Sequence, residues 1–385
     1  MPLLTADYIY RPDQWCQNYA LNIDELGNIV ELRPLSSAES AIHYSGALCP
    51  GFVNVHCHLE LSILAGKIEE NTGMAGFIQR LMVARKTYTA EEQVTAIRQA
   101  MQQAWDSGTV AMGDISNSPL TAKAKVEQPL FTHTFIELLG LDGAKAAEIV
   151  QAAQEMAQAF DGLSYSLTAH APYSMSSELI RLIYQPSQDL YSIHLLESSE
   201  ERLLFESNAG PLVDFYRNFG IAFQAFKAKH PIEHITQGMQ EKQAVIFVHN
   251  TEMTPEEIHQ LVHDFPQTHF CLCPRANDFI HRTFPAIFRF LPYSDRICIG
   301  TDSLASNHSL DLFEELKAIK SRYPGISFHQ LMQWATTNGA KALQQGANFG
   351  IFAAGRRPGV NLISEIEQKD GEPDINMSSR VLKLY

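Results

Sequence analysis

The chain has 385 residues, of which 45% are hydrophobic and 19% are charged, the balance of an ordinary folded protein rather than a disordered one. Its 29 Lys and Arg residues against 43 Asp and Glu residues give a net charge of −14, which argues against a nucleic-acid partner. No apolar run reaches the roughly 18 residues of a spanning helix, and the N-terminal "MPLLTADYIY" lacks the basic start and apolar core of a secretory signal, so no membrane partner is expected.

The two ends of the chain carry short β-type runs separated by turn residues. Residues 1–49 contain "ADYIY", "ALNIDELGNIVELRP" and "AIHYSGALCPG", and the second run predicts a hairpin around Gly27 and Asn28. Residues 347–385 contain "GIFAAGRRPGVNLISEIE" and "SRVLKLY". We therefore predict a small β-sandwich domain built from both ends, 1–49 plus 347–385.

Between these ends, residues 50–346 alternate apolar runs with helical patterns. Two of the helical patterns, "TAEEQVTAIRQAMQQAWDSG" and "GAKAAEIVQAAQEMAQAFDG", stop at a glycine. The apolar runs that read as strands are "CPGFVNVH", "TVAMGDI", "FTHTFIELLG", "SYSLTAH", "LYSIHLL", "AVIFVHN", "HFCLCP" and "RICIGTD". Eight such strands with helices between them predict an α/β protein with a (β/α)8 TIM-like barrel.

The predicted strands share one feature, an ionisable group at or near the C-terminal end. Those groups are His56, His58, Asp114, Glu137, His170, His194, His249, Arg275 and Asp302. A barrel brings the C-terminal ends of its strands to one face, where catalytic groups of this fold lie. We therefore expect a functional site there, with Asp114 and Glu137 in either supporting or structural positions.

A metal site is expected at the same face. His56 and His58 stand two residues apart on one strand, so their rings project to the same side while Cys57 points away and packs. Together with His194 and Asp302 they form a set of three imidazoles and one carboxylate. Such a set suits one divalent metal with a water ligand, Zn²⁺ by preference and Fe²⁺ as the alternative.

Four segments then carry a family resemblance. "CPGFVNVHCH", "IHLLES", "VFVHN" and "IGTDSLASNHSLDLFEELK" resemble, in this order, motifs of the amidohydrolase superfamily, in its branch of chlorohydrolases and aromatic deaminases. The resemblance runs from about residue 46 to 345. A bridged metal pair is disfavoured, because the fourth strand ends "LTAHAPYS" and offers no lysine to carry a bridging carbamate.

The resemblance implies a role for each matching residue. His56, His58, His194 and Asp302 would be the metal ligands, with Asp302 also taking a proton from the attacking water. Glu197 would carry a proton to the ring nitrogen of the substrate, and His249 would hydrogen-bond the water. The alternative readings are a solvated carboxylate at an acidic helix start for Glu197, a buried strand histidine for His249 and a strand-end cap for Asp302.

Substrate contacts are implied by the same comparison. His170 stands in an H-x-P-Y-S segment that contacts substrate in adenosine-type deaminases, and Ser306 and Asn307 form the SN of the last motif. "HCHLELS" resembles the aminodeoxyfutalosine deaminases of a menaquinone pathway, in which Glu60 would bond a purine edge or a ribose hydroxyl.

Two arginines are candidates for an anionic part of that substrate. Arg275, or else Arg282, would receive it with the fork geometry of guanidinium. The alternatives are a first-turn helix carboxylate for Glu60 and surface salt bridges for the arginines.

These features predict a metal-dependent hydrolase that releases ammonia from an adenine-like ring, with aminodeoxyfutalosine as the narrower substrate. The alternatives are another enzyme of the same branch, such as a guanine or cytosine deaminase or a chlorohydrolase, and a catalytically silent barrel that serves as a binding protein. Six irregularly spaced cysteines favour a reduced, cytoplasmic setting. A small molecule is the expected partner, and a homodimer is an assembly we consider.

Overall fold

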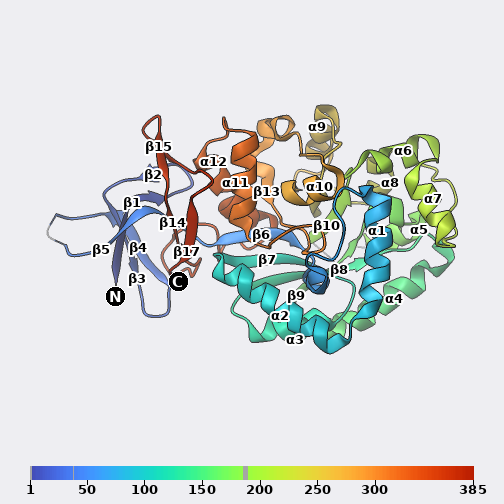
Figure 1. The fold of residues 1–385 in the computed structure, drawn as a ribbon, viewed down its shortest axis with the longest axis horizontal. Helices are drawn as coiled ribbons and strands as arrows, with labels where there is room; N and C mark the ends of the chain where they lie inside the picture. The colour runs from blue at the N-terminus through green and yellow to red at the C-terminus, as the bar shows by residue number, and fades with distance from the viewer. Residues whose placement is uncertain (1, 38, 185–189) are drawn as a thin grey trace.

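The computed structural model describes residues 2–37, 39–184 and 190–385. A sheet formed by the two ends of the chain lies at one end of the molecule, and the helices and strands of the central region form the larger part beside it (Figure 1). Both termini lie next to the terminal sheet.

The terminal sheet confirms that the two ends of the chain pair. Its order is β17-β14-β5-β1-β3-β4, with β2 paired to β1, and β5 lies antiparallel to β14. The strands are β1 (Leu3–Tyr10), β2 (Trp15–Cys16), β3 (Tyr19–Ile23), β4 (Ile29–Pro34), β5 (Ile42–Cys49), β14 (Asn361–Ser364) and β17 (Arg380–Lys383). The predicted hairpin is β3 and β4, with Gly27 at a φ of 85° in its turn. A separate pair, β15 (Glu367–Lys369) and β16 (Glu372–Asp374), completes this region.

The eight predicted strands of the central region are all present as two four-stranded parallel sheets, β6-β7-β8-β9 and β10-β11-β12-β13. Their bounds are β6 (Phe52–Cys57), β7 (Thr109–Ser116), β8 (Phe131–Leu138), β9 (Ser164–Ala169), β10 (Leu190–Leu195), β11 (Ala244–His249), β12 (Thr268–Leu272) and β13 (Ile297–Ile299). At one seam the amide of His194 donates to the His170 carbonyl at 2.9 Å, and at the other the amide of Asp302 donates to the His56 carbonyl at 3.1 Å. These bonds close the predicted barrel at the residues expected to form its site.

Helices cover the outside of the barrel. They are α1 (Gly73–Ala84), α2 (Ala90–Asp106), α3 (Leu120–Glu127), α4 (Ala146–Ala157), α5 (Ser177–Ile183), α6 (Ser199–Ser207), α7 (Pro211–Asn218), α8 (Pro231–Thr236), α9 (Pro255–Asp264), α10 (Pro274–His281), α11 (Leu312–Arg322), α12 (Phe328–Gln333) and α13 (Gly339–Ala342). The two helices predicted to stop at a glycine are α2 and α4, followed by Gly108 and Gly162 at positive φ.

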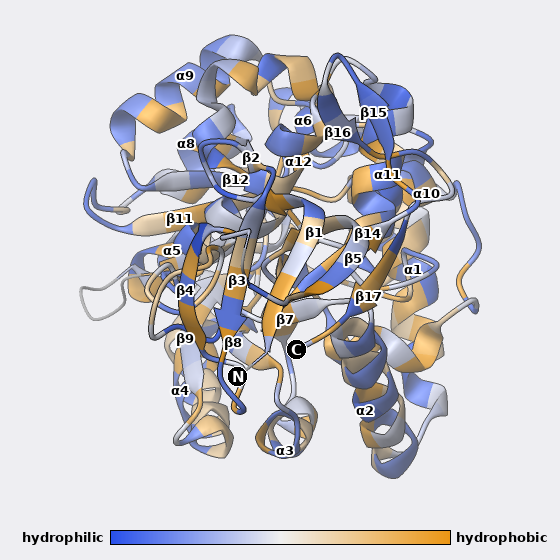
Figure 2. Cartoon of the chain, turned by 90° about the vertical axis from the view of Figure 1, so that its left-hand side faces the viewer, coloured by the Kyte–Doolittle hydropathy of each residue, from blue (hydrophilic) through white to orange (hydrophobic). Residues whose placement is uncertain are grey.

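The barrel strands are largely buried, whereas the outer helices carry both apolar and polar residues. Every residue of β6, β7, β10 and β11 is buried, as expected for parallel strands covered on both faces. The outer helices mix hydrophilic and hydrophobic residues along their length (Figure 2). Among the described residues, none of these helices has the length and apolar character needed to cross a membrane.

The predicted domain boundaries stay predictions. Strand β5 of the terminal sheet ends at Cys49 and barrel strand β6 begins at Phe52. On the other side, α13 ends at Ala342 and β14 begins at Asn361. Cys57 packs in a cluster with Leu59 under α2, on the side away from the cavity described below.

A buried ion pair fixes the turn that follows the His56–His58 segment. Asp114 on β7 contacts the Lys125 ammonium of α3 at 2.5 Å with both side chains fully buried, and its other oxygen accepts from the Leu59 amide at 2.8 Å. Lys125→Met leaves an unpaired buried carboxylate, so we expect the free energy of unfolding to fall by about 3–5 kcal/mol in urea denaturation. Adding Asp114→Asn should recover much of this loss; a single variant within about 1 kcal/mol of wild type contradicts the prediction.

Candidate metal centre and active site

The four predicted metal ligands converge at the C-terminal face of the barrel. Their ring nitrogens and carboxylate oxygen approach closely: 3.3 Å between His58 Nε2 and His194 Nε2, and 3.4 Å and 3.6 Å from Asp302 Oδ1 to His58 Nε2 and His56 Nε2. All four residues are buried. The four side chains lie on β6 and β10 or just after β6 and β13, and they therefore point at one small volume.

The chain takes an unusual backbone conformation where three strands end. Leu196, His249 and Asp302 have φ values of 48°, 69° and 55°, in the left-handed region that residues with side chains seldom adopt. Each such residue costs roughly 1–3 kcal/mol and persists only where its surroundings hold it. The Leu196 carbonyl accepts from the Glu252 amide at 2.9 Å, and the Asp302 amide donates to β6. The sharp turns aim the strand-end side chains across the barrel mouth.

The donor set fits a divalent metal. Burial lowers the pKa of His58 to about 3 and that of His194 well below its usual value, so both imidazoles are neutral and have lone pairs to offer. Burial opposes ionisation of Asp302, but its contact with His56 and the other neighbouring imidazoles lower its pKa, and it stays a carboxylate. Neither ring nitrogen of His56 has a hydrogen-bond partner although both are buried. Coordination of a metal would give one of these two nitrogens a partner.

Two hydrogen bonds orient the ligand atoms. His194 Nδ1 donates to the His170 carbonyl at 3.1 Å, which leaves Nε2 unprotonated and directed at the cluster. Ser306 Oγ donates to Asp302 Oδ2 at 2.5 Å, which leaves Oδ1 facing the histidines. These contacts fix the tautomer and the carboxylate rotamer before any metal binds.

Glu197 and His249 meet beside the metal ligands. Their side chains approach to 3.5 Å between Glu197 Oε1 and His249 Nε2, and Asn277 Nδ2 donates to His249 Nδ1 at 3.2 Å, which places the ring proton on Nε2. Burial, followed by the charge of Asp302, raises the pKa of Glu197 well above its usual value. Burial lowers the pKa of His249 to about 3. These shifts favour the protonated form of Glu197 beside a neutral His249 imidazole.

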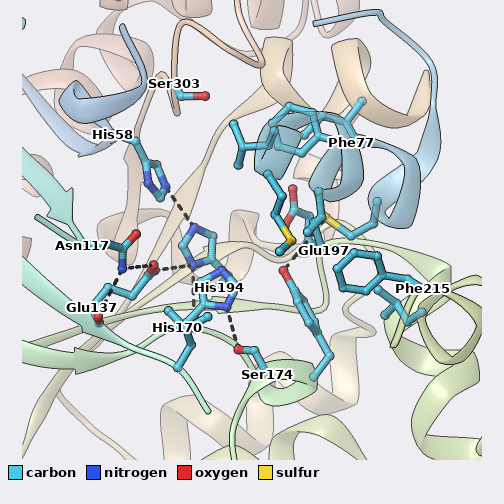
Figure 3. A pocket seen from close by; sticks show the side chains of 18 of the residues that line it. His58, Phe77, Asn117, Glu137, His170, Ser174, His194, Glu197, Phe215 and Ser303 are labelled. Carbon is cyan, nitrogen blue, oxygen red and sulfur yellow. Dashed lines mark hydrogen bonds and ion pairs between the residues drawn. The ribbon is translucent and has the colours of Figure 1, made fainter. Parts of the chain in front are cut away.

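A cavity of ≈ 390 Å³ opens onto this cluster. Its polar lining consists of His58, Arg85, Asn117, Glu137, His170, Ser174, His194, Glu197, His249, Asp302 and Ser303. Its apolar lining comes largely from α1 and α7, with Met74, Phe77, Ile78, Leu81, Met82, Leu212 and Phe215. Figure 3 shows the two sides: Asn117, Glu137 and His170 lie on one, Phe77 and Phe215 on the other. The volume is in the range of small-molecule sites.

On the polar side, His170 and Glu137 present atoms to the cavity. His170 Nδ1 contacts Ser174 Oγ at 2.6 Å, so that ring nitrogen is occupied and Nε2 is the free one. Glu137 Oε2 accepts from Asn117 Nδ2 at 3.0 Å, while Oε1 is buried without a hydrogen bond, 3.6 Å from His194 Nδ1. Burial raises the pKa of Glu137 to about 7. Glu137 thus lines the cavity, whereas Asp114 is taken up by its ion pair in the barrel wall.

Glu60 lies behind the cavity wall and does not line it. Its buried carboxylate accepts from Arg85 Nη2 at 2.7 Å, from the Asn117 amide at 3.0 Å and from Ser118 Oγ at 3.0 Å. Because these donors occupy both oxygens, the structure connects Glu60 to the cavity through Arg85 and Asn117. Direct contact between Glu60 and a substrate stays a prediction.

The remaining predicted substrate residues also lie outside the cavity lining. Arg275 donates to Ser309 Oγ at 3.2 Å and lies 3.8 Å from the buried Glu315, while Arg282 pairs with Glu70 near the surface. Asn307 donates to Glu315 at 2.8 Å and Ser306 supports Asp302. Substrate contact by these residues stays a prediction, because their described partners are other parts of the chain.

Sequence reasoning missed Arg85, Asn117 and the apolar wall. Arg85 and Asn117 read as ordinary polar residues of a helix end and a loop. The signal for the wall was the spacing of Met74, Phe77 and Leu81, an apolar stripe that also fits simple packing.

Comparisons with known proteins agree with this geometry. Residues 47–378 match the model of the amidohydrolase family. Adenosine deaminase of Helicobacter pylori is 26% identical over 381 residues, covering 94% of this chain and 91% of that protein. Aminodeoxyfutalosine deaminase of a Nitratiruptor species is 25% identical over 358 residues, covering 89% and 84%. A crystal structure of H. pylori aminofutalosine deaminase with methylthio-coformycin has a TM-score of 0.82 at 23% identity, covering 96% and 94%.

Proposed function

Because this chain belongs to the amidohydrolase family, we propose that it is a metal-dependent hydrolytic deaminase that releases ammonia from the adenine ring of a small nucleoside. The observation that carries the proposal is the Glu197–His249 pair, whose side chains meet at 3.5 Å beside the cluster of histidines and Asp302. Relatives with deaminase names, aligned over most of their length, support the same reaction.

The proposed cofactor is one divalent ion held by His56, His58, His194 and Asp302, with Zn²⁺ preferred over Fe²⁺. When bound, such an ion lowers the pKa of a coordinated water to about 7 and so supplies a nucleophile at neutral pH.

The chain's own residues would move the protons. The Asp302 carboxylate accepts a proton from the water. At the same time the oxygen of that water forms a bond to the carbon that bears the amino group. The Glu197 carboxyl gives its proton to the adjacent ring nitrogen, and His249 Nε2 donates a hydrogen bond to the incoming oxygen. The carbon–nitrogen bond then breaks, and the amino group takes the proton held by Asp302 and leaves as ammonia. The proton that remains on the added oxygen passes to the Glu197 carboxylate, so the ring keeps the oxygen as a carbonyl and both carboxyl groups return to their starting states.

The polar side of the cavity would hold the rest of the nucleoside. Glu137 Oε1 is buried without a hydrogen bond, Ser174 occupies only the Nδ1 of His170, and both residues line the cavity with hydrogen-bonding capacity left over. The cavity volume of ≈ 390 Å³ leaves room for a small molecule beside the metal and water, and the names of the adenosine and aminodeoxyfutalosine deaminases among the relatives support a nucleoside over a free base. Aminodeoxyfutalosine is one candidate, supported by the name of the Nitratiruptor relative.

The test is ammonia release by the zinc-loaded protein from adenosine, 5′-methylthioadenosine, S-adenosylhomocysteine and aminodeoxyfutalosine. We expect at least one to yield one ammonia per molecule, with conversion of the adenine ring to hypoxanthine. Protein with one metal per chain that releases no ammonia from any of the four overturns the proposal. Turnover of guanine, cytosine or a chlorinated triazine instead would favour another reaction of the same family.

A further inference from the structure

Helix α1 supplies much of the apolar wall of the cavity. Met74, Phe77, Ile78, Leu81 and Met82 all line it, and α1 contacts α7 and α10 at its sides. Figure 3 shows Phe77 across the cavity from Asn117 and Glu137. The position of this one helix therefore sets the width of the apolar side.

The N-terminus of α1 is held by a carboxylate from another helix. The two oxygens of Glu200, on α6, accept from the amides of Met74 at 2.9 Å and Ala75 at 3.1 Å. The N-cap residue Thr72 makes no side-chain cap bond, so Glu200 replaces the local cap and places a negative charge at the positive end of the helix. Gly73, at a φ of 69°, leaves space for the Glu200 carboxylate, because a Cβ at this position would lie 2.5 Å from Glu200 Oε1.

The C-terminal end of α1 is held by a second carboxylate. Arg85 is the C-cap residue, and its Nη2 donates to Glu60 Oε1 at 2.7 Å. Only 2% of the Glu60 side chain is exposed, and the Asn117 amide and Ser118 Oγ fix it from the other side. A cation at the C-terminus also complements the helix dipole. The wall helix is thus attached at both ends to carboxylates of the barrel face.

We propose that Glu200 and Glu60 are positioning residues that hold α1 and thereby determine which 5′ substituents the nucleoside can carry. This inference rests on the proposed function. The metal cluster and Glu197 occupy the polar end of the cavity. A substituent remote from the reacting ring would therefore contact the apolar side chains of α1 and α7. Glu197 lies in the loop just before α6 and Glu200 lies in the first turn of that helix, so the chain places the proton donor and the anchor of the wall three residues apart.

The kinetic test breaks the Glu200 contact from both sides. Glu200→Ala removes the acceptor, and Ala75→Pro removes one donor at a first-turn helix position that tolerates proline. We expect each to raise KM for 5′-methylthioadenosine, by about tenfold for Glu200→Ala, with kcat within about twofold and adenosine affected less than about threefold. Glu200→Gln, which keeps one acceptor oxygen, should recover part of the loss. Glu206→Ala, an exposed site on the same helix, is the matched control.

Amide hydrogen exchange gives a readout that does not need activity. Exchange across residues 74–84 should quicken by about tenfold in Glu200→Ala and not in Glu206→Ala, with the rest of the barrel unchanged. Unchanged exchange in α1, or equal KM changes for both substrates, overturns the proposal. Exchange is measured without substrate. A wild-type protein that releases no ammonia would therefore overturn the proposed function, while exchange in α1 would still test whether Glu200 holds the helix.

Discussion

Replacing His194 with alanine is expected to remove the bound metal and almost all deaminase activity. His194 contributes an Nε2 that lies 3.3 Å from His58 Nε2, and its Nδ1 is already committed to the His170 carbonyl. Loss of a ligand from such a buried set weakens metal binding and the activation of water together. We expect kcat/KM to fall by about 10⁴-fold, roughly 5.4 kcal/mol of transition-state stabilisation. Metal content by plasma emission spectrometry and an ammonia assay check this.

A second buried histidine provides the control. His133 lies on β8, where its ring nitrogens contact Ser164 Oγ at 2.8 Å and Ser166 Oγ at 3.0 Å, outside the cavity lining. His133→Gln should therefore keep one metal per chain, whatever it does to stability. If His194→Ala keeps its metal and more than about a tenth of wild-type activity, His194 is not a ligand that the reaction needs.

The barrel and its site face could be predicted because the relevant signals are short-range. Each strand is an apolar run that ends in a polar group, and parallel strands of a barrel must bring those ends together whatever the intervening helices do. That rule alone places His56, His194 and Asp302 near one another. The closure of the barrel through the His170–His194 and His56–Asp302 backbone bonds then agrees with it.

The substrate side could not be predicted in the same way, because its contacts join distant segments. Glu60 reads as a pocket residue in the opening motif, but the turn after β6 directs it to Arg85 and Asn117. Arg275 is a second case. Its backbone amide donates at 3.0 Å to the buried Glu315, which lies forty positions after it in the chain. Nothing local in the sequence distinguishes such partners from exposed charges, since each pairing depends on how helices pack on the barrel.

Substitution of Glu197 with glutamine should separate proton transfer from metal binding. Glutamine keeps the shape of the side chain and its contact with His249, but it has no proton to give to the ring nitrogen. Positioned acid–base groups contribute about 10²–10⁴-fold to rate, so we expect kcat to fall by about 10³-fold while KM changes little. Metal content should stay at one per chain, because Glu197 is not among the residues proposed as ligands.

The comparison with His194→Ala gives this experiment its meaning. Both variants lose activity, yet only Glu197→Gln should do so with the metal in place, which assigns the loss to the acid rather than to the nucleophile. Glu206→Gln removes the same kind of charge from the exposed side of α6 and should leave kcat unchanged. A Glu197→Gln enzyme with kcat within about fivefold of wild type would require another proton donor, and Glu137, whose pKa burial raises to about 7 and which faces the same cavity, is the next residue to test.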